Sequence, residues 1–526
     1  MRPRRTLSRS PIAVLALLAA VLAGFVLARP LLPVDETRYL SVAWEMWQSG
    51  DLLHLTRNGA LYAHKPPLLF WIINLVWSVT GVSELPARLV GPAFGVATAW
   101  ASARLARQLW PDAEGIGVRA ILVLCGFSVF LIYASATMFD TMLALATVAG
   151  LGIIWRIGQG AARARDWALL GLALGAGVYA KGPVIVVHVL PVLIAMPLWS
   201  ARAPGAGGLL RGTALSVLVA LALVALWLAP ALVTGTPAYR EELLWTQTAA
   251  RVAGGLAHDR PVWFLAALLP LLLFPWGWSP RLWRDAVRLV RVEPQVRMLA
   301  LQAAAAFVLF SLMSGKQAHY LLPEYPAVAL IAARALHTRL GPARKAELGF
   351  AVLPILLGLL ALAAAARLLP ASPALEALQP NAALAGVGAL AVVLGAAVLT
   401  LGTEQAGLLA GLGLAVCLHL LVASTWVRKG FDAGEIAPRL AAAEGIAIYG
   451  MTYSAEFNFA ARLTSPVAEP ADTAALAAWI AAHPGGIVFG PVDSVPLTAP
   501  PEQTIAYNGS LLGLWPVAQG TSSVRE

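Results

Sequence analysis

Residues 35–71, with the sequence DETRYLSVAWEMWQSGDLLHLTRNGALYAHKPPLLFW, lie between two apolar runs of the chain. The stretch begins with an adjacent acid pair, Asp35 and Glu36, and His64 and Lys65 precede two prolines near its end. Charged residues make up only 12% of the chain, so this cluster of acids, bases and aromatic side chains needs an explanation. The segments on either side indicate where the cluster lies.

The composition is that of a polytopic membrane protein. The 526 residues are 59% hydrophobic, with a mean hydropathy of +0.75, whereas soluble domains are about half apolar and a quarter charged. The net charge of +10 comes from arginines in short loops between apolar runs, as the positive-inside rule requires, which argues against a nucleic-acid partner. Cys125 and Cys417 lie in apolar segments and are expected to be buried thiols without a disulfide.

The first apolar run, residues 11–28, follows a basic N-terminus, MRPRRTLSRS. A cleaved signal peptide has the same pattern, but this run ends in LARPLLPV, which is a poor cleavage site. We therefore predict an uncleaved first span that begins in the cytoplasm of a bacterial cell. Asp35 and Glu36 then lie just outside, on the periplasmic or extracytoplasmic face.

Arginine-rich loops indicate the other crossings, because basic residues collect on the cytoplasmic side. Lys65 is expected outside and Arg104 inside, which requires an odd number of crossings between them. The apolar segment 67–80 is short for a span, so we predict a non-spanning helix on the outer surface. About thirteen spans then fit the chain, near residues 11–29, 85–108, 118–136, 139–156, 166–180, 182–199, 209–233, 262–279, 298–314, 321–338, 348–369, 382–402 and 405–426.

Two domains are expected. Residues 1–426 form an all-α transmembrane domain whose first outer loop covers residues 30–84. Beyond residue 426 acids, prolines and tyrosines return, GIAIYG (445–450) and GIVFG (486–490) have the composition of short buried strands, and residues 472–483 have helical spacing. Residues 427–526 are therefore predicted to be a small extracytoplasmic α/β domain, with packing or partner docking favoured over catalysis.

The loops predicted outside carry an unusual set of polar residues: Asp35, Glu36, Arg38, Tyr39, His64, Lys65, Asp140, Lys181, Tyr239, Arg251, His258, Asp259, Arg260, Lys316, His319, Tyr320 and Glu324. Charges at membrane depth are costly and usually mark function. Carboxylates suit acid–base chemistry, and lysine, arginine, histidine and tyrosine suit phosphate oxygens. Both kinds on one face indicate an enzyme whose substrate has a lipid tail and a phosphate head.

Structural roles compete with these functional ones. Asp140 would cap the helix that follows it, and Lys181 and Lys316 would extend their amines to the membrane surface. Glu36 would pair with Arg38 or another base. Asp35 is the hardest to explain in this way, because two adjacent acids at the end of a span are expensive without a function.

The stretch DETRYLSVAWEMWQSGD…LYAHKPPLLFW, followed by SELPARL, resembles the first periplasmic loop of the aminoarabinose transferases that modify lipid A. It is more distantly similar to the protein O-mannosyltransferases. MFDTM, AKGP and KQAHYLLPEYP resemble later motifs of the same family in the same order, and the resemblance covers residues 11–340. It implies an integral-membrane glycosyltransferase of the GT-C fold that uses a polyprenyl-phosphate sugar.

The resemblance also implies roles. Asp35 would be the catalytic carboxylate with Glu36 beside it, and Asp140 would line the same cavity. The donor phosphate would be held by Lys65, Arg251, His319 and Tyr320, to which the outer-face reasoning adds Arg38, Lys181, Arg260 and Lys316. One departure is His64, which replaces the glutamate of FEKPP in that family and puts an aminoarabinose donor in doubt. His64 would instead be a candidate ligand for a divalent metal, zinc or magnesium.

The sequence therefore predicts transfer of a sugar from a polyprenyl (undecaprenyl) phosphate, with inversion, to a lipid A-like glycolipid or a protein at the periplasmic face. A non-catalytic transporter, or flippase, of polyprenyl-linked sugars is the main alternative, but it predicts inverted repeats, which the sequence does not show. A ligase or acyltransferase of the cell envelope would need a recognisable serine or histidine arrangement and fits less well.

Overall fold

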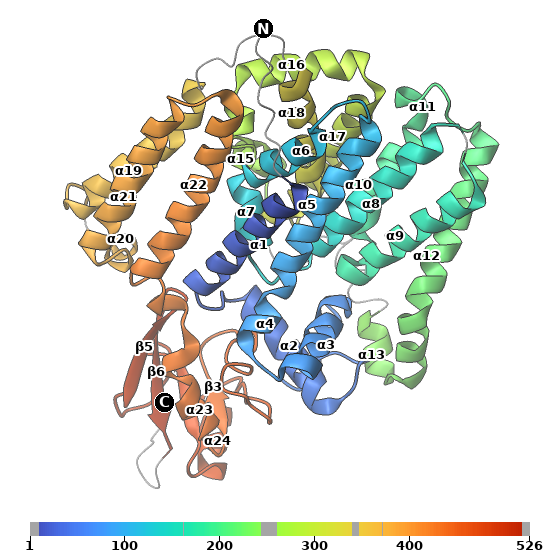
Figure 1. Cartoon of the computed structure of the whole chain (residues 1–526). Coiled ribbons are helices and arrows are strands. Elements are labelled where there is room, and N and C mark those ends of the chain that lie inside the picture. Colours follow the sequence, from blue (N-terminus) through green and yellow to red (C-terminus); the bar gives the residue numbers. More distant parts are fainter. Residues whose placement is uncertain (1–9, 161, 244–259, 339–346, 371, 518–526) are drawn as a thin grey trace.

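The computed structural model describes residues 10–160, 162–243, 260–338, 347–370 and 372–517. Most of the chain forms an all-helical bundle, and a small domain that contains a sheet is attached at one end of it (Figure 1). The expected combination of an all-α membrane domain and a C-terminal α/β domain is confirmed.

The bundle is built from helices and short 3-10 turns. They are α1 (Pro11–Ala28), α5 (Val90–Leu109), α6 (Ile116–Cys125), α7 (Ser128–Ala134), α8 (Asp140–Gly158), α9 (Ala164–Lys181), η1 (Gly182–Val184), α10 (Ile185–Ile194), α11 (Met196–Trp199), α12 (Ala206–Thr234), α13 (Pro237–Glu241), α15 (Phe264–Leu272), η3 (Trp276–Trp278), α16 (Pro280–Val292), α17 (Pro294–Leu312), η4 (Ala318–Glu324), α18 (Tyr325–Thr338), α19 (Leu348–Ala365), α20 (Pro373–Ala377), α21 (Asn381–Val398) and α22 (Thr403–Ser424).

Eight helices in the described part of the chain are long and apolar enough to cross a membrane. The pair α6 and α7, bent by 80°, would make a ninth if it forms one span. The expected spans at 166–180 and 182–199 largely coincide with one continuous candidate, residues 164–194. The helices α15 and α18, with 9 and 14 residues, are short for a crossing. The count of thirteen therefore stays a prediction.

The first loop, residues 30–84, folds into α2 (Asp35–Ser49), the short hairpin β1 (Thr56–Arg57) and β2 (Ala60–Leu61), α3 (Leu68–Thr80) and α4 (Glu84–Arg88). Gly50 ends α2 in the left-handed conformation, and its backbone N–H donates to Met46 O at 3.0 Å, a usual helix terminus. The helix expected at 67–80 is present as α3 and lies beside α2 at one end of the bundle (Figure 1). Its position outside the bilayer stays a prediction.

The C-terminal domain contains η5 (Lys429–Phe431), η6 (Ala433–Glu435), α23 (Ala437–Ala441) and α24 (Thr473–Ala482) around a four-stranded sheet. The sheet order is β3 (Ile446–Ile448), β4 (Ile487–Pro491), β6 (Ser510–Pro516) and β5 (Gln503–Tyr507), with β3 and β4 parallel and the other neighbours antiparallel. The two strands and the helix expected from sequence are confirmed, and β5 and β6 complete the sheet.

This domain is docked on α2 and α3 of the first loop. Ser41 Oγ donates to Ala455 O at 2.6 Å, and Trp44 Nε1 donates to Leu463 O at 2.8 Å. The ring of Trp77 stacks on Phe459 with centroids 5.4 Å apart. The helix that begins at Asp35 is therefore supported from both sides, by the bundle and by the C-terminal domain.

A close backbone approach brings the outer end of α5 against the segment that leads into α8. A Cβ atom on Gly91 would lie 2.1 Å from Ala136 O, so no other residue fits there without a shift of the backbone. Thr141 Oγ1 donates to Gly91 O at 3.1 Å across the same contact. This packing fixes the place of Asp140, the first residue of α8.

Candidate active site

Asp35 is the first residue of α2 and has a partly exposed carboxylate. Its Oδ1 accepts hydrogen bonds from the Arg38 guanidinium and, at 2.9 Å, from Tyr39 Oη. Both donors lie on the next turn of the same helix, where i+3 and i+4 side chains meet. The Asp35 side chain remains 36% exposed, so a substrate can reach it. Two donors thus hold the carboxylate in one orientation.

The partners of Asp35 are themselves fixed in their charge states. Burial raises the pKa of the Tyr39 hydroxyl well above its usual value, and Asp35 raises it further. Burial alone would lower the pKa of Arg38, but Tyr62, Tyr39 and Asp35 outweigh it and raise the pKa. Tyr39 is therefore a neutral hydrogen-bond donor and Arg38 a permanent cation at neutral pH.

Asp140 and Lys181 form an ion pair beside this helix. Lys181 Nζ donates to Asp140 Oδ1 at 2.5 Å, and the Asp140 side chain is 1% exposed. Lys181 Nζ also lies 4.6 Å from the centroid of the Tyr320 ring, within cation–π range. Asp140 therefore positions Lys181. Its carboxylate forms this ion pair in place of the helix cap that was the alternative expectation.

Lys65 reaches the same cluster from the first loop. Burial and the nearby Lys181 charge lower the pKa of Lys65 to about 8, against the opposing influence of Asp35 and Asp140. Its Nζ lies 5.8 Å from the Phe139 ring centroid. Two amines and two carboxylates from separate segments of the chain therefore act on each other at one place.

His319 lies in η4 at the edge of the cluster. Its ring centroid is 5.5 Å from that of Tyr133 and 5.0 Å from that of Tyr320. Burial lowers the pKa of His319 to about 4, although Asp140 acts in the opposite direction. His319 is thus neutral at pH 7 and offers a hydrogen bond in place of a charge.

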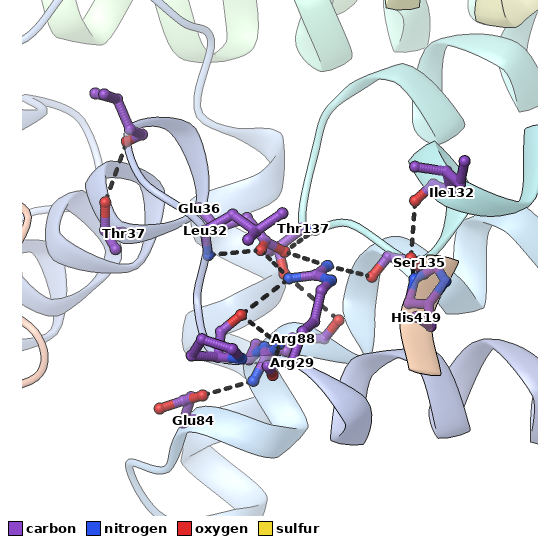
Figure 2. A network of polar contacts seen from close by, with 12 residues as sticks. Arg29, Leu32, Glu36, Thr37, Glu84, Arg88, Ile132, Ser135, Thr137 and His419 are labelled. Carbon is purple, nitrogen blue, oxygen red and sulfur yellow. Dashed lines mark hydrogen bonds and ion pairs between the residues drawn. The ribbon is translucent and has the colours of Figure 1, made fainter. Parts of the chain in front are cut away.

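Glu36 lies in a buried network of polar contacts (Figure 2). Its carboxylate accepts hydrogen bonds from the Arg29 guanidinium and from the backbone N–H groups of Leu32 at 3.0 Å and Thr137 at 2.7 Å. Glu36 is 2% exposed. Burial would raise its pKa, but Arg29 and then Arg88 outweigh burial and lower it. The catalytic role expected for Glu36 lacks an accessible oxygen, and we assign it a positioning role.

The network ties four segments together next to Asp35. Arg29 donates to Ser135 O at 3.0 Å, and Arg88 donates to Arg29 O at 2.8 Å and to Glu84 Oε1 at 2.7 Å (Figure 2). The end of α1, the start of α2, the helix α4 and the segment before α8 therefore meet in one network, in which Glu36 binds Arg29 and Arg29 O in turn accepts from Arg88. Neither Arg29 nor Arg88 was expected at the site from the sequence. The signal that could have found them is their position: Arg29 directly follows the first apolar run, and Arg88 lies within SELPARL.

Two other expected phosphate ligands are placed elsewhere. The Lys316 amine donates to Arg260 O at 2.9 Å, Pro261 O at 3.2 Å and Ser311 O at 2.9 Å, and the residue is 1% exposed. All three N–H groups are used in holding the chain, which corrects the phosphate-binding expectation for Lys316. Arg260 is exposed and lies over the Phe264 ring at 5.4 Å. Arg251 lies outside the described residues.

The residues do not fit a bound metal. Among the described residues there is no group of three or more histidines, cysteines, aspartates or glutamates that could hold an ion. His64 stacks on Tyr62 with ring centroids 5.3 Å apart. Burial, with Arg57 and Arg38, lowers the pKa of His64. We derive no step through a zinc or magnesium ion.

Tyr62 is a further site residue that the sequence analysis missed. It is 1% exposed, its hydroxyl has no hydrogen-bond partner in the described part of the chain, and burial raises its pKa to about 12. The charges of Arg38 and Asp35 act on it, so it lies within reach of both. It therefore offers an unused hydroxyl donor beside the Asp35 carboxylate.

The arrangement can hold an anion and present a carboxylate to it. Lys65 and Lys181 supply positive charge, and His319 and Tyr320 supply polar groups at the rim. Preorganised cations stabilise a leaving phosphate most strongly where water is excluded. The Asp35 carboxylate can receive a proton or orient an attacking group.

Known sequences resemble this chain over part of its length. A family model described as dolichyl-phosphate-mannose-protein mannosyltransferase matches residues 64–233. The undecaprenyl phosphate-alpha-4-amino-4-deoxy-L-arabinose arabinosyl transferase of Pseudomonas paraeruginosa is 34% identical over 342 residues, which are 64% of this chain and 61% of the relative. The protein of the same description from Pseudomonas aeruginosa is 33% identical over the same extent. The match therefore spans less than two thirds of these relatives.

Solved structures extend the likeness to the whole chain at the level of the fold. The crystal structure of ArnT from Cupriavidus metallidurans bound to undecaprenyl phosphate superposes with a TM-score of 0.76, covering 98% of this chain and 99% of that chain at 19% identity. The apo structure of the same protein gives 0.74 at 20% identity. The chain thus resembles the lipid A aminoarabinose transferases in sequence and has the fold expected from that resemblance.

Proposed function

We propose that this chain is an inverting glycosyltransferase that moves a sugar from undecaprenyl phosphate, or a related polyprenyl phosphate, to an envelope acceptor. The single observation that carries the proposal is the cluster of Asp35, Lys65, Asp140 and Lys181, in which the oriented, partly exposed Asp35 carboxylate and the Lys181–Asp140 pair all act electrostatically on the Lys65 amine. An anionic leaving group and an attacking acceptor need these two features together.

The reaction follows from the charges. An acceptor oxygen attacks the anomeric carbon of the sugar from the face opposite the bond to the lipid phosphate. That bond breaks and its electron pair leaves on the phosphate, where Lys65 and Lys181 neutralise the charge. A phosphate acceptor, as in lipid A, is already nucleophilic, and Asp35 then orients the sugar; a hydroxyl acceptor would give its proton to Asp35.

The names of the relatives make 4-amino-4-deoxy-L-arabinose the first donor sugar to test. His64 is the reason to test other donor sugars as well. By the resemblance to the aminoarabinose transferases it replaces a glutamate, whose carboxylate would contact a cationic amino-sugar. A lowered pKa keeps His64 neutral at neutral pH, so it supplies no counter-charge to an amine. A neutral hexose or pentose on the same lipid phosphate is the alternative donor.

The site is proposed to face the periplasm, with the chain in the bacterial inner membrane. Several apolar helices make it a multi-pass membrane protein. The positive-inside distribution of arginines supports a periplasmic first loop, and the C-terminal domain is docked on that loop. An acceptor in the outer leaflet would approach from this side.

Mass spectrometry of envelope glycolipids and glycoproteins tests the proposal directly. Cells with the chain, without it, and with Asp35→Asn or Asp112→Asn are compared; Asp112 is an exposed aspartate away from the cluster. A sugar-sized mass that is lost in the deletion and in Asp35→Asn, and kept in Asp112→Asn, supports transfer and identifies sugar and acceptor together. An unchanged acceptor pool with polyprenyl-phosphate sugar accumulating on one leaflet would favour the transporter.

A further inference from the structure

The helix α16 (Pro280–Val292) lies at the end of the bundle opposite the first loop and the C-terminal domain (Figure 1). Its sequence, PRLWRDAVRLVRV, has four arginines and one aspartate, which gives a net charge of +3. Leu282 and Leu289 are buried against the bundle, while Trp283 and Val287 are 51% and 49% exposed. At 100° per residue the arginines occupy one side and the apolar residues the other. Such a helix lies in the plane of a membrane surface.

Three arginines of this helix are exposed. Arg284, Arg288 and Arg291 form no side-chain ion pair within the described ranges of the chain. The spacing of four and three residues puts the three guanidinium groups on adjacent turns of one face. Guanidinium groups bind phosphate oxygens through paired N–H donors.

Beneath α16 the bundle contains an apolar cavity of about 380 Å³. It lies between α15, α16, α17 and α18, and its lining includes Leu272, Trp283, Val287, Ala304, Phe307 and Val328. Trp283 is held at the mouth because its Nε1 donates to Gly277 O at 2.8 Å. At the far end the Glu324 carboxylate turns into the bundle, where its Oε1 meets His188 Nδ1 at 2.5 Å.

We propose that α16 and this cavity form a binding site for an anionic phospholipid of the adjacent leaflet. One acyl chain enters the cavity past Trp283 and Val287, and the phosphate rests on Arg284 and Arg288. The positive face of the helix and the apolar space below it match the two halves of one lipid molecule, and a helix charge of +3 selects an anionic head over a zwitterionic one.

The site is distinct from that of the donor proposed above. Lys65 and Asp35 lie in the first loop, and α16 lies at the other end of the bundle (Figure 1). A phosphate bound to the arginines of α16 therefore cannot be the phosphate held by Lys65 and Lys181. The bound phospholipid would steady α15, α17 and α18, and η4 with His319 and Tyr320 connects α17 to α18.

Native mass spectrometry of the purified full chain tests the site. The protein in detergent is titrated with phosphatidylglycerol or phosphatidylcholine of identical acyl chains. We expect phosphatidylglycerol to bind about thirtyfold more tightly, because each arginine near a lipid surface contributes about 1 kcal/mol and the phosphate rests on Arg284 and Arg288. The triple variant R284Q/R288Q/R291Q should abolish this preference. The matched control R165Q/R202Q/R211Q removes three exposed arginines outside α16 and should keep it.

Two variants test the cavity. Ala304→Trp fills it from α17, and Val287→Trp fills it from the exposed side of α16, so that one remains informative if the other fails to fold. Each should weaken retention of phosphatidylglycerol about tenfold or more with all arginines in place. Equal losses in the two triple arginine variants would overturn the proposal, as would full lipid retention in both tryptophan variants. Displacement of phosphatidylglycerol by undecaprenyl phosphate would also overturn it, because the cavity would then hold the donor's tail.

Discussion

At the scale of single residues, the main result is the division of roles between Asp35 and Glu36. The two side chains are adjacent in sequence and leave α2 in different directions. Asp35 stays partly exposed beside Lys65, and Glu36 is buried on Arg29. One carboxylate is therefore available for chemistry and the other holds four segments of chain together.

This division predicts opposite phenotypes. Glu36→Gln leaves Arg29 buried without its counter-charge, which should destabilise the protein by about 3–5 kcal/mol. Asp35→Asn should leave the melting temperature within a few degrees of the wild type and abolish transfer. Thermal unfolding in detergent, run beside the transfer assay, separates the two. The reverse outcome, a Glu36→Gln variant that is fully stable but inactive, would return Glu36 to the chemistry.

Lys65 predicts a pH dependence. Its pKa of about 8 means that it carries its charge below pH 8 and loses it as the pH rises through that value. Only the charged amine binds the donor phosphate, so kcat/KM for the donor should fall about tenfold per pH unit above about 8. Lys65→Arg should move this fall in kcat/KM to higher pH, because arginine stays protonated. If the fall stays at the same pH, it belongs to another titrating group.

At the scale of elements, α2 depends on the C-terminal domain. The Trp77–Phe459 stack and the Ser41 and Trp44 hydrogen bonds hold this domain against the helix that carries Asp35. Phe459→Ala removes a 2% exposed ring, a change that typically costs about 3–5 kcal/mol. Hydrogen exchange in α2 should rise and transfer should fall. The control, Phe431→Ala, alters a partly exposed ring in the same domain and should change neither.

The elements also show what could be predicted from sequence. Strands β3 and β4 and helix α24 were predicted because short apolar runs and helical spacing are local signals. The pairing of Glu36 with Arg29, the saturation of Lys316 by three carbonyls and the docking of residues 455–467 on α2 were not predicted, because each depends on segments that meet only in the folded chain. The sequence indicated which residues are chemically unusual, and the packing decided which of them share a site.

At the scale of the whole molecule, the two ends of the bundle differ in chemistry. The end with the first loop carries the acid–amine cluster and the docked domain, and the opposite end carries the basic helix α16 (Figure 1). The predicted topology puts the first end on the periplasmic side. The thirteen expected spans remain a prediction, since several of the helices are shorter or more polar than a typical crossing.

Cysteine labelling tests this topology. Both native cysteines are buried, which keeps the background low. Thr80→Cys, at the end of α3, should react with a membrane-impermeant maleimide in intact spheroplasts, and Asp112→Cys should react only after permeabilisation. Labelling of Asp112→Cys alone in intact cells would invert the orientation, and labelling of both would show that the membrane was not sealed.

The central claim is that Asp35 and the nearby amines transfer a sugar from a polyprenyl phosphate. The most direct measurement uses purified protein in liposomes with a labelled undecaprenyl-phosphate sugar and lipid A, and follows the release of undecaprenyl phosphate together with the anomeric configuration of the product by NMR. The account predicts equal amounts of released lipid phosphate and glycosylated acceptor, an inverted anomer, and no turnover with Asp35→Asn. Full activity of Asp35→Asn, or movement of the intact donor across the bilayer without bond cleavage, would contradict it.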